Sequence, residues 1–183
     1  MNIGSVEEAQ KLFKKELEEL GVDDIELLSY DDEQRKSVAE YIKNQWETNL
    51  PGLEITINQQ SNKQKLALED KQDYDISHSC WRNEIRDPVD FLTVLLSAGS
   101  YNWQDFKNEE YDELVNEAQT NFSDNEKRFS NLQEAERILI GEEAAISPMY
   151  IAGSVKLIEP YVHNYIEHSD DTYSYKGLNL INN

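Results

Sequence analysis

The sequence has little cysteine, few basic residues and no long apolar run, and each shortage excludes a class of protein. Cys80 is the only cysteine among 183 residues, so the chain has no internal disulfide and no cluster with the spacing of a zinc site. Lys and Arg number 17 against 37 Asp and Glu, which gives a formal net charge of −20. Such an acidic surface repels phosphate and anionic lipid, which argues against nucleic acid and membrane surfaces as partners.

Hydrophobic segments and glycine motifs are also missing where other classes of protein have them. The longest apolar stretch, residues 91–96, is far below the roughly 20 residues of a membrane helix. The N-terminus lacks the basic and apolar regions of a signal peptide, so we expect neither a signal peptide nor direct membrane insertion by this chain. No Gly-rich phosphate loop, GxSxG or HExxH motif occurs, and we expect no cofactor and no metal site.

The first half of the chain alternates between helical and strand-like patterns. Ser5 and Glu8 form a capping-box pattern, and Gly21 supplies a helix stop. Val38, Tyr41, Ile42 and Trp46 have the spacing of a buried helical stripe. The predicted elements, in order, are a helix over 6–20, a strand over 25–30, a helix capped by Asp31 and ended by Pro51-Gly52, a strand over 53–58, a short helix over 63–69 and a strand over 74–79. This order predicts parallel strands joined by right-handed crossovers.

The second half is predicted to be mainly helical. Asp87 and Pro88 favour a helix start, because Asp is a preferred cap and Pro a preferred first helical residue. After a loop over 97–102, two amphipathic helices follow, the second opened by a capping box at Ser123. Their predicted core positions are Tyr111, Leu114, Val115, Ala118 and Phe122, then Phe129, Leu132, Ala135, Ile138 and Leu139. Residues 144–151 and 155–158 are typical of strands, and residues 168–183 are expected as a loosely ordered tail.

These patterns predict one α/β domain over residues 1–183, with a mixed, largely parallel sheet and flanking helices. The first candidate site is the stretch 77–92, since it follows a strand at the carboxyl end, where open sheets bind ligands. Trp81 is either an apolar wall for a ligand or a ring that folds back onto the domain. Glu84 and Asp87 are the acid pair that a small hydrolase- or glycosidase-like enzyme would use, although chance pairs are expected among 37 acids.

Four motifs in order resemble those of the family-five extracellular solute-binding proteins, the peptide- and oligopeptide-binding proteins of bacterial ABC importers. They are Asp73-Tyr74-Asp75-Ile76 with Trp81, an acid three residues later and Asp87-Pro88; Ser100-Tyr101-Asn102-Trp103; Asn108-Glu109-Glu110-Tyr111-Asp112-Glu113-Leu114; and residues 133–139 with 146–150. The resemblance implies part of the second lobe of a periplasmic-binding-protein-like (type II) fold. It also implies that the first lobe, the hinge and the lipoprotein signal are missing from this chain.

The resemblance implies a non-enzymatic receptor that binds an extended oligopeptide as an added strand. Carried over by position, Cys80, Trp81 and Arg82 offer backbone hydrogen bonds, and Glu84 holds the peptide ammonium. Asn83 and His78 are expected beside them. The chain departs from the family pattern, which commonly has Asp and an aromatic residue where Glu84-Ile85 stand and small residues at Arg82-Asn83.

Partners implied by the resemblance are the first lobe, an ABC permease and an oligopeptide, at the extracellular face of the cell membrane. The family also includes nickel, haem and saccharide receptors, but no Met/His cluster here points to a metal. Two alternatives remain at this point. One is a small acidic α/β enzyme of hydrolase or glycosidase type, and the other is an interaction fragment without a ligand.

Overall fold

The structure, a computed structural model, describes residues 5–21, 24–153, 155–168 and 172–181. The chain divides into two compact units, Met1–Cys80 and Trp81–Asn183, and each unit is described by itself. The expectation of one domain over residues 1–183 stays a prediction. None of the described helices is long and apolar enough to cross a membrane.

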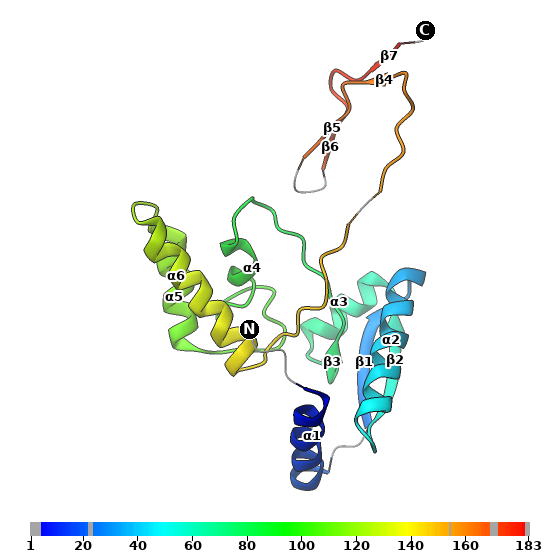
Figure 1. Ribbon diagram of the computed structural model, residues 1–183, viewed down its shortest axis with the longest axis vertical. Helices are drawn as coiled ribbons and strands as arrows, with labels where there is room; N and C mark the ends of the chain where they lie inside the picture. Colours follow the sequence, from blue (N-terminus) through cyan, green and yellow to red (C-terminus); the bar gives the residue numbers. More distant parts are fainter. Residues whose placement is uncertain (1–4, 22–23, 154, 169–171, 182–183) are drawn as a thin grey trace. The chain divides into compact units, whose positions relative to one another are not determined.

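The first unit is built around a three-stranded parallel sheet with three helices (Figure 1). Strand β1 is central, and it pairs in parallel with β2 from Asp24–Glu54 to Tyr30–Gln60 and with β3 at Leu27–Ile76. This arrangement confirms the predicted α/β fold with crossover helices. The elements are α1 (Val6–Leu20), β1 (Asp24–Tyr30), α2 (Glu33–Asn49), β2 (Glu54–Gln60), α3 (Asn62–Asp70) and β3 (Ile76–Ser77).

The core of the first unit lies between the sheet and α2. Leu27 and Leu28, which alternate faces along β1, are both fully buried, as expected for a central parallel strand. The predicted stripe of α2 is correct for Ile42, but Tyr41 is 61% exposed. Because successive residues turn by about 100° around a helix, a stripe centred on Ala39 and Ile42 leaves Tyr41 on the outer side.

Caps explain where two of these helices begin. The predicted capping box at the start of α1 is present: the Ser5 N–H donates to Glu8 Oε2 at 3.0 Å, and the Glu8 N–H donates to Ser5 Oγ at 3.1 Å. The cap of α2 is Asp32 and not Asp31, since Asp32 Oδ1 accepts the Arg35 N–H at 3.0 Å. Asp31 still belongs to the strand pairing, because its N–H donates to the Gln60 carbonyl at 3.0 Å.

Side chains of α2 cover part of the edge of β2, one of the two outer strands. Glu47 Oε1 accepts the Ile55 N–H at 2.9 Å, and Lys43 donates to the Ile55 carbonyl and pairs with Glu47. Open strand edges template pairing with other chains, and native proteins block them with charged side chains. At Ile55 the chain therefore satisfies its own strand edge.

The second unit is helical, with two short antiparallel strand pairs (Figure 1). Its core residues are Val89, Leu92, Leu95, Phe106, Tyr111, Val115, Ala118, Leu132, Ala135, Ile138 and Leu139. The Tyr111 hydroxyl, fully buried, donates to the Leu92 carbonyl at 2.6 Å and so joins α5 to α4. The elements are α4 (Val89–Thr93), α5 (Glu109–Thr120), α6 (Asn125–Glu136), the π-helical turn η1 (Arg137–Glu142), β4 (Val162–His163), β5 (Ile166–Glu167), β6 (Tyr173–Ser174) and β7 (Asn179–Leu180).

Three expectations for these helices are wrong. Phe122 lies beyond the end of α5 and is 69% exposed. Phe129 is 56% exposed, because Arg128 and Asn131 take the inward positions of the first turns of α6. The cap of α6 is Asp124 instead of Ser123, since Asp124 Oδ1 accepts the Lys127 N–H at 2.9 Å.

The C-terminal expectations also need correction. Strands were predicted over residues 144–151 and 155–158, but the structure has no strand in either segment. A strand requires a partner for its backbone groups, and apolar alternation alone does not supply one. The tail instead contains β6 and β7 among its described residues 172–181, paired with β5 and β4.

Candidate ligand-binding site

A buried charged cluster supports the chain as it leaves β3 in the first unit. Lys65 and Glu69, one turn apart on α3, are fully buried and form an ion pair. Lys65 Nζ also donates to Ser77 Oγ at 2.8 Å and to Ser79 Oγ at 2.5 Å, and both hydroxyls donate to Glu69 Oε1 at 2.6 Å. Burial lowers the pKa of Lys65, and the hydrogen bond to Glu69 opposes that shift. The cluster fixes residues 77–79 to α3.

Tyr30, the last residue of β1, contacts two cations with its ring. The Tyr30 ring centroid is 4.5 Å from Lys65 Nζ and 4.4 Å from the guanidinium carbon of Arg35. Burial raises the pKa of Tyr30. Arg35 in turn donates to Cys80 Sγ at 3.4 Å and to Asp32 Oδ2 at 2.7 Å. The first turn of α2 therefore contacts Cys80, which is exposed.

His78 is held against β1 by its backbone and its side chain. Its N–H donates to the Leu28 carbonyl at 2.8 Å, which continues the pairing of β3 with β1, and its Nδ1 lies 3.1 Å from Ser29 Oγ. Burial lowers the pKa of His78, and the positive charges of Lys65 and Arg35 lower it further. The imidazole is therefore neutral at pH 7, so His78 is a poor cationic contact for a peptide carboxylate.

Trp81 opens the second unit and packs against a row of aromatic rings. The ring centroids of Trp81 and Tyr101 are 5.0 Å apart, and those of Tyr101 and Trp103 are 5.7 Å apart in an edge-on arrangement. Asn102 fixes this loop, since its amide donates to the Phe106 carbonyl at 2.7 Å and its Oδ1 accepts the Phe106 N–H at 3.0 Å. Trp81 and Tyr101 are still 37% and 50% exposed, so each ring presents a free surface.

Glu84 combines a fixed backbone with an exposed carboxylate. Its N–H donates to Asp90 Oδ2 at 2.7 Å, and Asn83 donates to the Ile85 carbonyl at 2.7 Å. The Glu84 carboxylate makes no hydrogen bond or ion pair with any residue in the described part of the chain. An exposed acceptor of this kind can bind a cation, and Arg82 beside it is also exposed.

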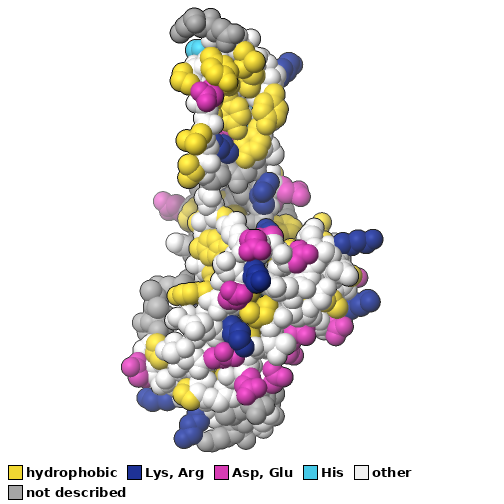
Figure 2. Space-filling model, turned by 90° about the vertical axis from the view of Figure 1, so that its right-hand side faces the viewer, with side chains coloured by type: hydrophobic (Ala, Val, Ile, Leu, Met, Phe, Trp, Pro, Cys, Tyr) yellow, Lys and Arg dark blue, Asp and Glu magenta, His cyan; other side chains and the backbone are white. Residues whose placement is uncertain are grey.

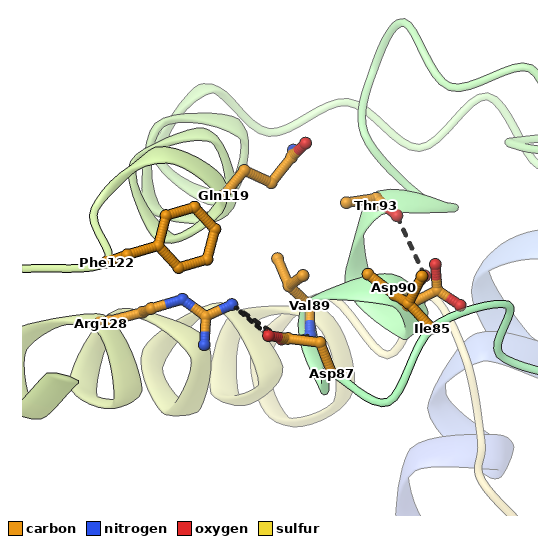
Figure 3. Close-up of a pocket in the computed structure, with 8 residues that line it drawn as sticks. All are labelled: Ile85, Asp87, Val89, Asp90, Thr93, Gln119, Phe122 and Arg128. Carbon is orange, nitrogen blue, oxygen red and sulfur yellow. Dashed lines mark hydrogen bonds and ion pairs between the residues drawn. The ribbon is translucent and has the colours of Figure 1, made fainter. Parts of the chain in front are cut away.

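Asp87 is fixed at the start of α4 and is not available as a catalytic acid. Its Oδ1 accepts the Val89 N–H at 2.9 Å, which confirms the predicted capping role, and Arg128 Nη2 lies 2.7 and 2.8 Å from its two oxygens (Figure 3). Burial opposes the charge of Asp87, but the hydrogen bonds from Arg128 and Val89 outweigh it and lower its pKa. Asp87 therefore stays ionised at neutral pH.

The Asp87–Arg128 pair forms one wall of a pocket of about 300 Å³ in the second unit (Figure 3). Arg128 is almost buried, donates from Nε to the Ala118 carbonyl at 2.7 Å, and places its guanidinium carbon 5.3 Å from the Phe122 ring centroid. The lining residues are Ile85, Asp87, Val89, Asp90, Thr93, Gln119, Phe122 and Arg128. No group of three or more metal-ligating side chains occurs among the described residues.

The structure brings together only part of what the sequence predicted as a site. Cys80 and His78 contact α2 and β1, while Trp81 and Glu84 are fixed from within the second unit. Sequence reasoning missed Lys65, Arg128 and Tyr101 as supports. For Lys65 a signal existed, the four-residue spacing to Glu69 on a predicted helix, whereas Arg128 is 41 residues from Asp87 and no local pattern links them.

The first unit is an α/β unit built on a parallel sheet, and comparison with known proteins identifies its family. The profile of the bacterial extracellular solute-binding proteins, family 5, middle region, matches residues 3–103, just over half of the chain. The chain belongs to this family. Its fold is therefore part of a type II periplasmic-binding-protein lobe, as the sequence predicted.

Curated relatives match most of this chain with a small share of their own length. The probable deoxycholate-binding periplasmic protein YgiS of Escherichia coli is 30% identical over 146 residues, 80% of this chain and 26% of the relative. The periplasmic murein peptide-binding protein MppA of Escherichia coli is 28% identical over 149 residues, which are 81% of this chain and 27% of the relative. The chain thus spans about a quarter of these relatives. Both relatives are named as binding proteins, in contrast to the hydrolase alternative.

Solved structures match almost the whole chain. An oligopeptide ABC transporter substrate-binding domain from Bacillus anthracis is 36% identical with a TM-score of 0.87, covering 97% of this chain and 35% of that one. Listeria monocytogenes OppA bound to peptide is 32% identical with a TM-score of 0.85, and the match covers 97% of this chain and 34% of that one.

Proposed function

We propose that this chain supplies one side of the ligand cleft of a peptide-binding receptor for an ABC importer, acting at the extracellular face of the cell membrane. The bound peptide lies extended along residues 80–82, whose backbone supplies hydrogen bonds that do not depend on the peptide sequence. The Glu84 carboxylate holds the peptide ammonium, and the partly exposed Trp81 ring forms an apolar wall. Asn83, Arg82 and His78 border the peptide.

The observation that carries this proposal is the state of Glu84. Its backbone is tied to Asp90 at 2.7 Å, yet its carboxylate is exposed and has no partner among the described residues. A positioned carboxylate that accepts hydrogen bonds from an ammonium contributes roughly 1.5–3 kcal/mol. The neighbouring acids differ in this respect, since Asp87 forms an ion pair with Arg128 and Asp90 accepts a hydrogen bond from the Glu84 N–H.

We propose the class of ligand from the names of the relatives together with the state of Glu84. Several carry peptide or oligopeptide in their names, including MppA and the Listeria receptor, whereas YgiS is described as a deoxycholate-binding protein. A peptide ammonium requires a carboxylate partner, and a bile-acid anion does not. The unpaired Glu84 therefore favours a peptide over deoxycholate.

The test uses a two-lobed receptor in which this chain replaces the matching third of the Bacillus anthracis substrate-binding domain, called the chimera below. Glu84→Gln is expected to weaken peptide binding in calorimetry by about 10- to 100-fold, with little change in stability. Acetylation of the peptide N-terminus should produce a loss of the same size. The two losses should not add, because both remove one contact.

Glu40→Gln is the matched control, since Glu40 is exposed on α2 and the charge change is the same. It should leave affinity unchanged. Equal affinity of the chimera and its Glu84→Gln variant for the free-amino peptide would refute the anchor. Tighter binding of deoxycholate than of any oligopeptide would refute the ligand class. The 183-residue chain alone is expected to bind peptides more weakly than about 1 μM, because it offers only one side of a cleft.

A further inference from the structure

The backbone leaves its pairing with β1 soon after β3 begins. β3 ends at Ser77, and the His78 N–H makes one more backbone hydrogen bond, to the Leu28 carbonyl at 2.8 Å. Within the described part of the chain, the N–H and C=O groups of Ser79 and Cys80 make no backbone–backbone hydrogen bond. A fixed position of this backbone therefore has to come from side chains.

The buried ion pair of α3 holds this segment at two points. The Lys65 ammonium has three N–H donors, and they meet three acceptors, which are Glu69 Oε1, Ser77 Oγ and Ser79 Oγ. Both serine hydroxyls donate in turn to the same Glu69 oxygen at 2.6 Å, and they lie 3.4 Å from each other. We call these four side chains the Lys65 cluster. It ties residues 77 and 79 to a single point on α3.

His78 holds the segment on its other face. The His78 Nδ1 lies 3.1 Å from Ser29 Oγ on β1, while the serines on either side of it contact Glu69 on α3. Side chains of an extended segment alternate between two faces. Residues 77–79 are therefore extended and are held on both faces, although regular strand pairing has ended.

The polar character of the Lys65 cluster indicates a role beyond stability. Figure 2 shows charged side chains spread over the surface, whereas Lys65 and Glu69 are 0% and 1% exposed. Well-packed apolar residues of similar volume are often as stable as a buried ion pair, or more stable. They would not fix where the two serine hydroxyls lie, because only hydrogen bonds depend on both distance and angle. The property that the ion pair adds is therefore position.

We propose that the Lys65 cluster positions the backbone of Ser79 and Cys80, where the proposed peptide edge begins, for the addition of the ligand main chain. The four side chains are positioning residues and need not touch the ligand. A backbone that is already fixed loses less conformational entropy when a strand adds to it, so the free energy of binding is more favourable. The inference rests on the proposed receptor function and adds to it a group of residues separate from the Glu84 anchor.

The first experiment separates position from stability in the chimera. Lys65→Met with Glu69→Leu removes the hydrogen bonds of the ion pair to both serines, and the apolar pair should keep most of the stability. Peptide affinity in calorimetry should still fall by about 10-fold or more, and by the same factor for tetraalanine and tetraserine, because main-chain bonds do not depend on peptide side chains. A purely structural role predicts native affinity in this variant, and that result would overturn the inference.

Serine variants test the same role with the ion pair in place. Ser77→Ala with Ser79→Ala should lower the affinity by about 10-fold, whereas Ser77→Thr with Ser79→Thr keeps both hydroxyls and should recover it to within about 3-fold. Ser37→Ala is the matched control, because the Ser37 hydroxyl donates to the Glu33 carbonyl on the exposed side of α2. It should leave the affinity unchanged. Equal affinities of the alanine pair and this control would contradict the proposal.

Backbone dynamics of the 183-residue chain provide a test that needs no ligand. NMR order parameters at residues 78–80 should be about 0.85 in the native chain, the value of rigid backbone. In the Lys65→Met, Glu69→Leu variant they should fall below about 0.6 at these residues and stay unchanged in β1. Order parameters at residues 78–80 that are equal in the two proteins would refute the positioning role.

The anchor and the Lys65 cluster can fail independently. Glu84→Gln should lower the affinity by the same factor with and without the cluster, since the two act on different groups of the peptide. A cluster effect that disappears in the Glu84→Gln background would overturn the inference, because the cluster would then act through the anchor. Affinity that responds to the cluster and not to Glu84→Gln would refute the anchor and leave the inference standing. The reverse result would refute the inference alone.

Discussion

The two units hold their own residues near the boundary at Cys80 and Trp81 by different physical means. The first unit holds residues 77–80 with buried charges, where Lys65 and Glu69 join two serine hydroxyls and Arg35 contacts Cys80. The second unit holds residues 84–90 with an apolar helical core and one ion pair, Asp87 with Arg128. Buried charges depend on every partner being present, whereas apolar packing loses stability in proportion to the contacts removed. The comparison predicts that single substitutions are more damaging on the first side.

The largest effect is expected at Lys65. Lys65→Met leaves the Glu69 carboxylate buried with only two hydroxyl donors, and its Oε2 already lacks a partner among the described residues. The free energy of unfolding should fall by about 3–5 kcal/mol, as for other broken buried pairs. Urea denaturation would measure the loss, and native-state hydrogen exchange would locate it in β1 and not in α5.

Adding Glu69→Leu to Lys65→Met is the control, because it removes the orphaned charge and should restore most of the stability. A double variant no better than the single one would contradict the assignment of the loss to an unpaired charge. Equal loss of protection in β1 and α5 would show that the units unfold together, which would break the comparison.

A smaller and pH-dependent effect is expected at Asp87. Asp87→Asn removes the charge that pairs with the nearly buried Arg128 and should lower the free energy of unfolding at pH 7 by about 2 kcal/mol. The pKa of Asp87 is lowered in the folded state, so the native carboxylate stabilises above the ordinary Asp pKa of about 3.9 and loses this effect as pH falls through the folded pKa.

The difference in stability between the native chain and Asp87→Asn should therefore be constant above about pH 5 and shrink toward pH 2. Parallel urea titrations of both proteins from pH 2 to pH 7 would test this. A difference that does not change over that interval would exclude the ion pair as its source.

The smallest of the three effects is expected at Tyr111. Tyr111→Phe keeps the packed ring beside Phe106 and removes only the hydroxyl bonded to the Leu92 carbonyl. A loss of about 1 kcal/mol is expected, because one buried hydrogen bond is removed while the Leu92 carbonyl still accepts the Leu95 N–H at 3.1 Å. Tyr41→Phe, on an exposed ring, should change stability by less than about 0.5 kcal/mol. Equal losses in thermal denaturation would show that the Tyr111 hydroxyl is not what joins α5 to α4.

Local patterns predicted the helices well and the contacts between elements poorly. The start of α1 and the capping role of Asp87 depend on residues within four positions, and both are confirmed. The predicted strand over 74–79 is reduced to Ile76–Ser77, and those over 144–151 and 155–158 are absent from the described residues. Strand formation depends on a partner distant in sequence or on another chain, and no periodicity encodes that partner.

The candidate site divides in the same way. The sequence was sufficient to predict that Trp81 and Glu84 follow a strand, and ligands of open parallel sheets bind at the carboxyl ends of strands. The support by Arg128 could not be predicted, because its partner Asp87 is 41 residues away. For Lys65 the spacing to Glu69 indicates a pair, but a buried cation looks like a surface one in sequence, so the burial of the pair could not be predicted. Only the fold shows that these side chains are inward and paired.

The aromatic row at Trp81 gives the chain an intrinsic optical reporter. Trp81 lies against Tyr101 and is 37% exposed, so a ligand that covers it would remove water from the indole and shift its fluorescence. Trp46, which packs against the core of the first unit, and Trp103, which lies next to Tyr101, also contribute to the emission. Occupancy of the proposed cleft can therefore be followed by tryptophan emission, with no added dye and no change to the sequence.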